Sequence, residues 1–126
     1  MGQDKKDQTY IYEVVEDWAQ LPKDWSFHEV AAVGTDADDN VYVFSRSDHP
    51  VTVFARDGKF LGSWGEGEYL RPHGITMGPD STIYLTDDGN HCVKSVRLKE
   101  RFCLHSDCQG SHLLISLEIF FIAVRM

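Results

Sequence analysis

The feature that most constrains this chain is an internal repeat at a distance of 42 residues. Residues 31–33 align with residues 73–75, and the alignment then continues without insertion. A period of about 40–45 residues that contains several short strands is typical of the four-stranded blades of a β-propeller. The sequence therefore predicts an all-β fold of propeller blades. Further matched pairs are Asp38 with Asp80, Val41 with Ile83, Tyr42 with Tyr84, Val43 with Leu85, His49 with His91 and Val51 with Val93.

Strand-forming residues fill the repeat in short runs. Residues 41–44 and 51–54 are β-branched or aromatic, and polar residues bound both runs. The turn at residues 56–59 contains Gly58, which adopts a positive φ at no steric cost, so residues 52–55 and 60–64 are predicted to form a hairpin. Residues 65–68 are expected to lead to the next blade, where residues 78–81 repeat the first turn. No window shows convincing helical periodicity, although residues 12–20 are ambiguous.

The rest of the chain is interpreted around these blades. Residues 10–16 are expected to form an outer strand that would close a propeller, and residues 17–27 a loop held by packing of Trp18 and Trp25. The expected division is a disordered N-terminus at 1–9, an outer strand and connecting loop at 10–29, a first blade at 30–69, a partial second blade at 70–96 and an out-of-pattern tail at 97–126.

The repeat stops after about residue 96. Where a third turn should follow, the chain continues as Arg97-Leu98-Lys99-Glu100-Arg101-Phe102-Cys103. This change favours a frameshifted, unspliced or truncated gene product, and the alternative is a genuine capping element. With about one and a half blades, the chain is expected to be too short to close a ring. Its open strand edges and exposed blade faces then predict self-association.

Composition disfavours several classes of partner. The formal net charge of -8 disfavours nucleic acid, since the one basic stretch, at residues 94–101, is interrupted by Glu100. The apolar stretch at residues 113–124 contains Glu118 and is too short to span a bilayer, so no membrane association is expected. No signal peptide is visible, and the compartment stays open. Three cysteines without a CxxC pair do not form a disulfide framework, although a Cys103–Cys108 bridge is conceivable.

Several motifs add a family resemblance. They are residues 33–36, 39–44, 46–49, 70–75 and 86–93, which read VGTD, DNVYVF, RSDH, LRPHGI and TDDGNHCV. Together they resemble the NHL-type repeats of peptidyl-α-hydroxyglycine α-amidating lyase, over about residues 30–96. The resemblance implies a six-bladed propeller that holds zinc on three histidines near a structural calcium ion. Such enzymes split a peptidyl-α-hydroxyglycine substrate into a peptide amide and glyoxylate.

The resemblance also implies roles for individual residues. His73 would be the first zinc ligand, and Arg46 would contact the carboxylate or hydroxyl of the peptide substrate. The backbone carbonyls of Val33 and Ile75 would bind calcium. These types suit the chemistry, because imidazole binds zinc, guanidinium grips carboxylates and carbonyl oxygens bind calcium. The other zinc histidines and the catalytic tyrosine belong to later blades, so we expect no catalysis from this polypeptide alone.

Each candidate also has a structural interpretation. His73 could be a strand-start histidine bonded to the backbone, and Arg46 a surface or interblade salt-bridge residue. His49 and His91 are expected to share a structural role at equivalent turns. Asp87 and Asp88 are expected to act as a turn and hydrogen-bond acceptor pair.

Two alternatives stay open. In the tail, Cys103, His105, Cys108 and His112 could chelate zinc, although their spacing lacks the usual CxxC knuckle. At the level of function, the alternative to a lyase is an NHL propeller that binds a protein or ligand without catalysis.

Overall fold

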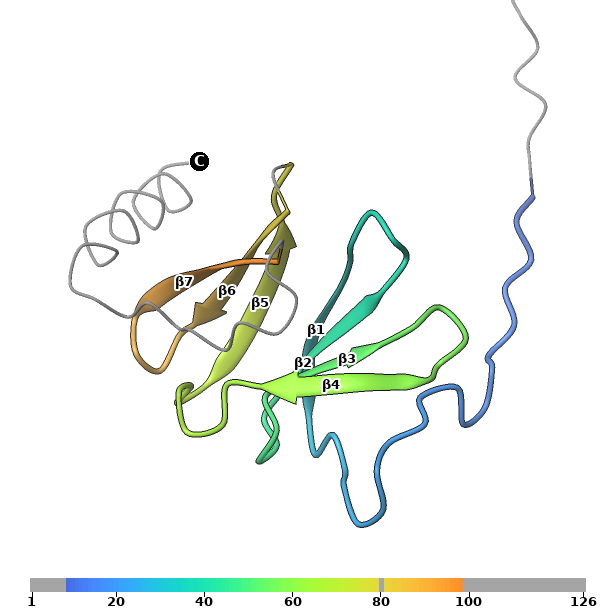
Figure 1. Cartoon of the computed structure of the whole chain (residues 1–126), viewed down its shortest axis with the longest axis horizontal. Coiled ribbons are helices and arrows are strands. Elements are labelled where there is room, and N and C mark those ends of the chain that lie inside the picture. Colours follow the sequence, from blue (N-terminus) through green and yellow to red (C-terminus); the bar gives the residue numbers. More distant parts are fainter. Residues whose placement is uncertain (1–8, 80, 99–126) are drawn as a thin grey trace, which may run out of the picture.

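The described part of the chain forms two antiparallel sheets. The computed structural model describes residues 9–79 and 81–98 (Figure 1). These residues contain strands and no helix, which confirms the predicted all-β fold. The first sheet has the order β1 (Val30–Thr35), β2 (Val41–Ser45), β3 (Val51–Phe54) and β4 (Phe60–Trp64), and the second has the order β5 (Pro72–Met77), β6 (Thr82–Asp87) and β7 (Cys92–Arg97).

The 42-residue repeat is reproduced in the strand register. Val33 on β1 pairs with Val43, and the equivalent Ile75 on β5 pairs with Leu85. Both inner strands carry an irregularity at the same place, between residues 30 and 32 and between residues 72 and 74. The turns that follow agree as well, since Asp39 and Ser81 both have a φ of 62°. The two sheets are therefore copies of one structural unit.

The hydrophobic core lies between the two sheets. Phe44 and Val51 of the first sheet and Ile83 and Leu85 of the second are fully buried in one cluster. The inner strands β1 and β5 approach closely at Gly34, where an added Cβ would lie 3.3 Å from the Met77 methyl carbon. The sheets thus stack face to face as blades do, and the fold is a partial β-propeller.

The other face of the first sheet is covered by aromatic side chains from the loop at residues 17–29. The rings of Trp18 and Phe27 lie 5.8 Å and 5.9 Å from that of Phe54, and Trp25 lies 5.5 Å from Phe60. Burial of both faces explains why β2 and β3 read as continuous apolar runs. The expected packing role of Trp18 and Trp25 is confirmed by these contacts.

The strand expected at residues 10–16 is not formed. The segment contains no assigned strand, and Ile11, Tyr12 and Val14 are 88%, 86% and 83% exposed. A strand needs the edge of another strand as its partner. The chain on the N-terminal side of the first sheet pairs with that sheet by a single bridge, between Gln20 and Lys59, and residues 10–16 precede this bridge. The first sheet does not extend past that bridge.

Some sequence predictions lie outside the described residues. They are the disorder of residues 1–8, the out-of-pattern tail from residue 99 onward, and the cysteine and metal candidates Cys103, His105, Cys108 and His112. The division of the chain into segments stays a prediction. Within the described residues, no helix is long and apolar enough to cross a membrane.

Candidate functional site

Arg46 and His73 come together at the end of the sheets where β1 and β5 begin. Arg46 directly follows β2, and its Nε donates a hydrogen bond of 3.2 Å to the carbonyl oxygen of Pro72. Pro72 precedes His73, so the guanidinium of the first blade lies beside the first strand of the second. Arg46 therefore contacts the residue that precedes His73 across the blade interface.

Arg46 also binds the residue that leads into β1. Its Nη1 lies 2.9 Å from Glu29 Oε2, and its backbone N–H donates a 2.8 Å hydrogen bond to the Glu29 carbonyl. The Arg46 side chain is 33% exposed. The ion pair lies within the first blade, and the hydrogen bond to Pro72 is the contact that Arg46 makes with the second blade. The role of Arg46 toward a substrate stays a prediction.

His73 occupies the irregular position of β5, between the paired residues Pro72 and Gly74, and it is exposed. A zinc site of the expected kind needs three protein ligands. Within residues 9–79 and 81–98, no three His, Cys, Asp or Glu side chains gather closely enough to hold a metal ion. The donors described here do not fit a complete zinc site, and the ligand role of His73 stays a prediction.

Val33 and Ile75, the predicted calcium ligands, occupy equivalent positions on the two inner strands. Val33 is 55% exposed and Ile75 is partly buried against the core between the sheets. Their assignment to calcium through backbone carbonyls also stays a prediction.

Asp87 ties the connection between the blades to the second sheet. Its fully buried carboxylate accepts hydrogen bonds from the backbone of Leu70 (2.7 Å), Arg71 (2.9 Å) and Asn90 (3.1 Å) and from the Asn90 amide (2.8 Å). Burial raises the pKa of Asp87, but these hydrogen bonds outweigh burial and lower the pKa below its ordinary value. Asp88 lies 3.3 Å from the Arg71 guanidinium. The interpretation as a turn acceptor is confirmed for Asp87, whereas Asp88 makes an ion pair and, among the described residues, its Oδ1 accepts no hydrogen bond.

Asp36 plays a comparable part in the turn after β1. Its carboxylate accepts hydrogen bonds from the backbone of Asp38 (2.9 Å) and Asn40 (3.0 Å) and from the Tyr42 hydroxyl (3.1 Å). Burial raises the pKa of Asp36, but the hydrogen bonds, led by those from Asn40, lower it overall. Burial and the Asp36 carboxylate in turn raise the pKa of Tyr42. The phenol therefore stays protonated and keeps donating to Asp36.

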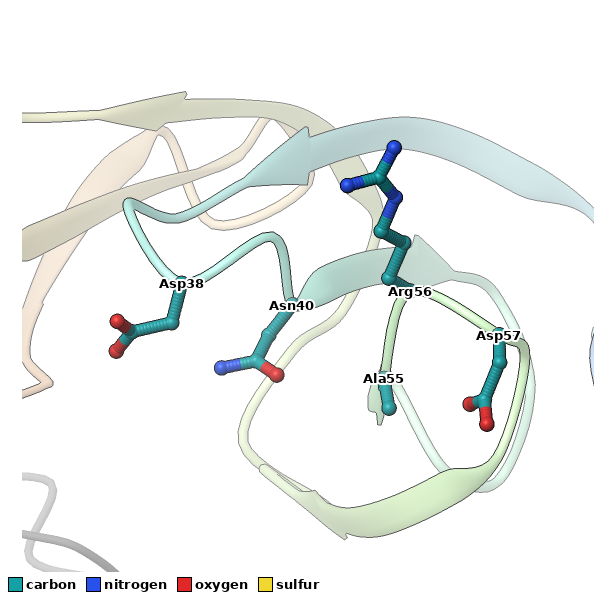
Figure 2. Close-up of a pocket in the computed structure, with 5 residues that line it drawn as sticks. All are labelled: Asp38, Asn40, Ala55, Arg56 and Asp57. Atoms are coloured by element: carbon teal, nitrogen blue, oxygen red, sulfur yellow. The ribbon is translucent and has the colours of Figure 1, made fainter.

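An open depression of about 620 Å³ lies at this opposite end of the first sheet. In Figure 2 the side chains of Asp38 and Asp57 face the same side of the turn region, whereas Arg56 points away from them. Arg56 instead reaches Asp39, at 3.3 Å. The depression is thus separate from the Arg46 and His73 end. Its lining residues are Asp38, Asn40, Ala55, Arg56 and Asp57.

The shared role expected for His49 and His91 is found only at His49. The His49 ring stacks on Trp25 with centroids 3.3 Å apart, and its Nδ1 lies 3.2 Å from Glu66 Oε1. His91 is exposed and has a φ of 53°. The reason for the difference is that Gly67 stands 42 positions after Trp25 and offers no ring for stacking.

Two residues around the candidate site are not among those singled out from the sequence. Glu29 pairs with Arg46, and nothing in the repeat marks it. The Tyr69 ring packs edge-on against Phe44 at 5.0 Å, and the Lys94 ammonium lies 4.5 Å from the Tyr69 centroid. Tyr69 could have been found, because an aromatic residue, Phe27, also stands 42 positions before it.

These features define a class: antiparallel blades that repeat every 42 residues and stack through a common core, which is a partial β-propeller. The comparison with known families agrees with this class. The model of the NHL repeat matches residues 69–94, which run from Tyr69 through β5 and β6 into β7. No curated protein matches the chain.

Proposed function

We propose that this chain supplies two blades of an NHL propeller of the α-amidating lyase type and binds the C-terminus of a peptidyl-α-hydroxyglycine. The observation that carries the proposal is the hydrogen bond from Arg46 Nε to the carbonyl of Pro72, at 3.2 Å. It holds a permanently charged guanidinium beside His73 at the start of an inner strand. Inner strands line the central channel of a propeller, where a ligand would enter.

The part assigned to this chain is recognition of the peptide carboxylate. A guanidinium presents several N–H donors in one plane and can grip a carboxylate at two points. Within the described residues, Arg46 uses Nε and Nη1 for Pro72 and Glu29, and Nη2 makes no hydrogen bond. His73, the residue after Pro72, is exposed and is proposed to offer a second polar contact. Zinc and calcium belong to the proposal for a complete propeller, and no step through them is derived from the residues described here.

A second candidate function is binding without catalysis. It is favoured by the engagement of Arg46 with both Glu29 and Pro72, because the bond to Pro72 joins the two blades and the pair with Glu29 holds Arg46 in place. In that case the Arg46 end carries no preference for a carboxylate.

Peptide binding to the full chain distinguishes the two candidate functions, recognition of the peptide carboxylate and binding without a preference for a carboxylate. Two labelled peptides of one sequence are compared by fluorescence anisotropy, one ending in α-hydroxyglycine and the other in a carboxamide. Because one charge-assisted contact contributes more than about 1 kcal/mol, we expect the α-hydroxyglycine peptide to bind at least about fivefold more tightly. The Arg46→Gln variant should lose this preference.

The control for charge is Arg56→Gln, which removes an exposed arginine at the opposite end and should keep the preference. Near-UV circular dichroism checks that Arg46→Gln retains packed aromatic side chains. Equal binding of both peptides by the unmodified chain, or an unchanged preference in Arg46→Gln, would overturn the lyase-type proposal.

A further inference from the structure

The ion pair between Glu29 and Arg46 has a counterpart in the second blade with the charges exchanged. Arg71 stands 42 positions after Glu29, and Asp88 stands 42 positions after Arg46. In the first blade the Arg46 N–H also donates to the Glu29 carbonyl, at 2.8 Å. In the second blade the Asp88 N–H donates to the Arg71 carbonyl at 3.2 Å, and Arg71 Nε lies 3.3 Å from Asp88 Oδ1. Either order of charges thus closes a blade at this point.

The order found in the first blade is therefore not required by the blade itself. It places an arginine directly after β2, and from there Nε reaches the Pro72 carbonyl of the second blade at 3.2 Å. An ionised aspartate at this position, as in the second blade, offers no donor for such a contact. Glu29 is the acidic partner of the arginine at the candidate site, and its effect on that site follows from the atoms that it binds.

The guanidinium group has two edges at which a carboxylate can accept two parallel hydrogen bonds. One edge presents Nε and Nη2, and the other presents Nη1 and Nη2. In Arg46 the Pro72 carbonyl oxygen binds Nε at 3.2 Å, and Glu29 Oε2 binds Nη1 at 2.9 Å. Each edge thus already has one of its two nitrogens bound. A ligand carboxylate that takes both nitrogens of one edge must share a nitrogen with the present acceptor or replace that acceptor.

Glu29 is the acceptor that can leave. The Pro72 carbonyl belongs to the backbone of β5, where Pro72 is buried and pairs with Asp87. The Glu29 side chain is 60% exposed, and its movement leaves the backbone hydrogen bond between Arg46 and Glu29 intact. Exposed ion pairs contribute little to stability, because water competes for both partners. Two carboxylates at one nitrogen also repel each other, which disfavours sharing.

We propose that Glu29 is an internal competitor, whose carboxylate binds Arg46 in the free protein and is displaced from Nη1 by the carboxylate of a ligand. This displacement rests on the proposed function, because it needs a peptide carboxylate that binds Arg46. A peptide carboxamide carries no charge to replace that of Glu29, and it leaves the ion pair closed. Glu29 therefore sets how tightly Arg46 holds a carboxylate.

The experiment measures binding of the same two labelled peptides to the full chain with Glu29→Gln or Glu29→Asp. Glu29→Gln removes the charge and keeps the shape, whereas Glu29→Asp keeps the charge but is one methylene shorter and withdraws it from Nη1. We expect both variants to bind the α-hydroxyglycine peptide about threefold more tightly than the unmodified chain, since an exposed ion pair has an effect of about this size. Binding of the carboxamide peptide should not change.

The matched control is Asp39→Asn. It removes a carboxylate that lies 3.3 Å from the other exposed arginine, Arg56, at the opposite end of the first sheet. Binding of both peptides should stay unchanged in this variant. Near-UV circular dichroism checks that the Glu29 variants keep packed aromatic side chains.

Three outcomes would contradict the displacement. If the unmodified chain prefers the α-hydroxyglycine peptide and both Glu29 variants bind it equally or more weakly, the competitor role is overturned and the proposed function stands. Tighter binding in Glu29→Gln without any in Glu29→Asp also overturns the competitor role, because the charge alone would then act. If neither the unmodified chain nor the two variants distinguish the peptides, the proposed function is overturned and the competitor role with it.

Discussion

At the scale of single residues, two carboxylates organise the loops. Asp87 gathers backbone N–H groups from the connection between the blades and from the turn after β6, and Asp36 does the same for the turn after β1. Their hydrogen bonds show that they serve as acceptors that fix the backbone.

The Asp87→Ala variant measures this contribution. It removes the acceptor for three backbone N–H groups around a fully buried position. Leaving a buried donor without a partner costs about 1–3 kcal/mol, so we expect the free energy of unfolding to fall by about 3 kcal/mol. Urea denaturation checks the value. A loss below about 0.5 kcal/mol would contradict this role, because surface changes have effects of that size.

The same carboxylate predicts a dependence of stability on pH. The folded-state pKa of Asp87 is lowered from its ordinary value of 3.8, so its contribution is present above that value and is lost as the pH falls through the folded pKa. Asp36 acts in the same direction. The melting temperature should therefore drop below about pH 4, and it should drop less steeply in Asp87→Asn. Parallel curves for the two proteins would contradict the assignment.

At the scale of elements, the loop at residues 17–29 is fastened to the hairpin of β3 and β4 through Gly58. Gly58 has a φ of 87°, and an added Cβ would lie 1.7 Å from the Trp18 carbonyl oxygen. A side chain there would force the loop away from the hairpin. The hairpin turn thus also serves as a docking point for the loop.

Gly58→Ala is expected to lower the free energy of unfolding by at least about 2 kcal/mol, since it combines backbone strain with a clash. Gly67→Ala is the matched control: its φ is 73°, but nothing lies within 4 Å of the added carbon. That variant should lose only the backbone term of about 1 kcal/mol. Urea unfolding followed by tryptophan emission compares them, and equal losses would show that the Trp18 contact contributes nothing.

The elements could be predicted to different degrees. The strands of both sheets follow from β-branched runs and turn residues, which act locally and repeat every 42 positions. Residues 10–16 have the same local character, yet form no strand, because pairing depends on a partner edge that sequence does not reveal. In the site, Arg46 could be singled out by its motif. Its partner Glu29 could not, because nothing in the repeat marks it, and the Pro72 carbonyl could not, because that contact exists only once the blades stack.

At the scale of the whole molecule, the packing between the two sheets positions the candidate site. The buried cluster of Phe44, Val51, Ile83 and Leu85 and the contact of Tyr69 with Phe44 join them into one body. The placement of Arg46 beside His73 follows from that packing. The proposed peptide site requires the stacked sheets.

The most direct test is a nuclear Overhauser measurement between the sheets in the full chain. The structure predicts cross-peaks from the Met77 methyl group to the Gly34 α-protons and from the Tyr69 ring to the Phe44 ring, because these groups are in contact. Cross-peaks between Val33 and Val43 and between Ile75 and Leu85 serve as the control that each sheet is formed. Cross-peaks within the sheets but none between them would contradict the stacked propeller blades.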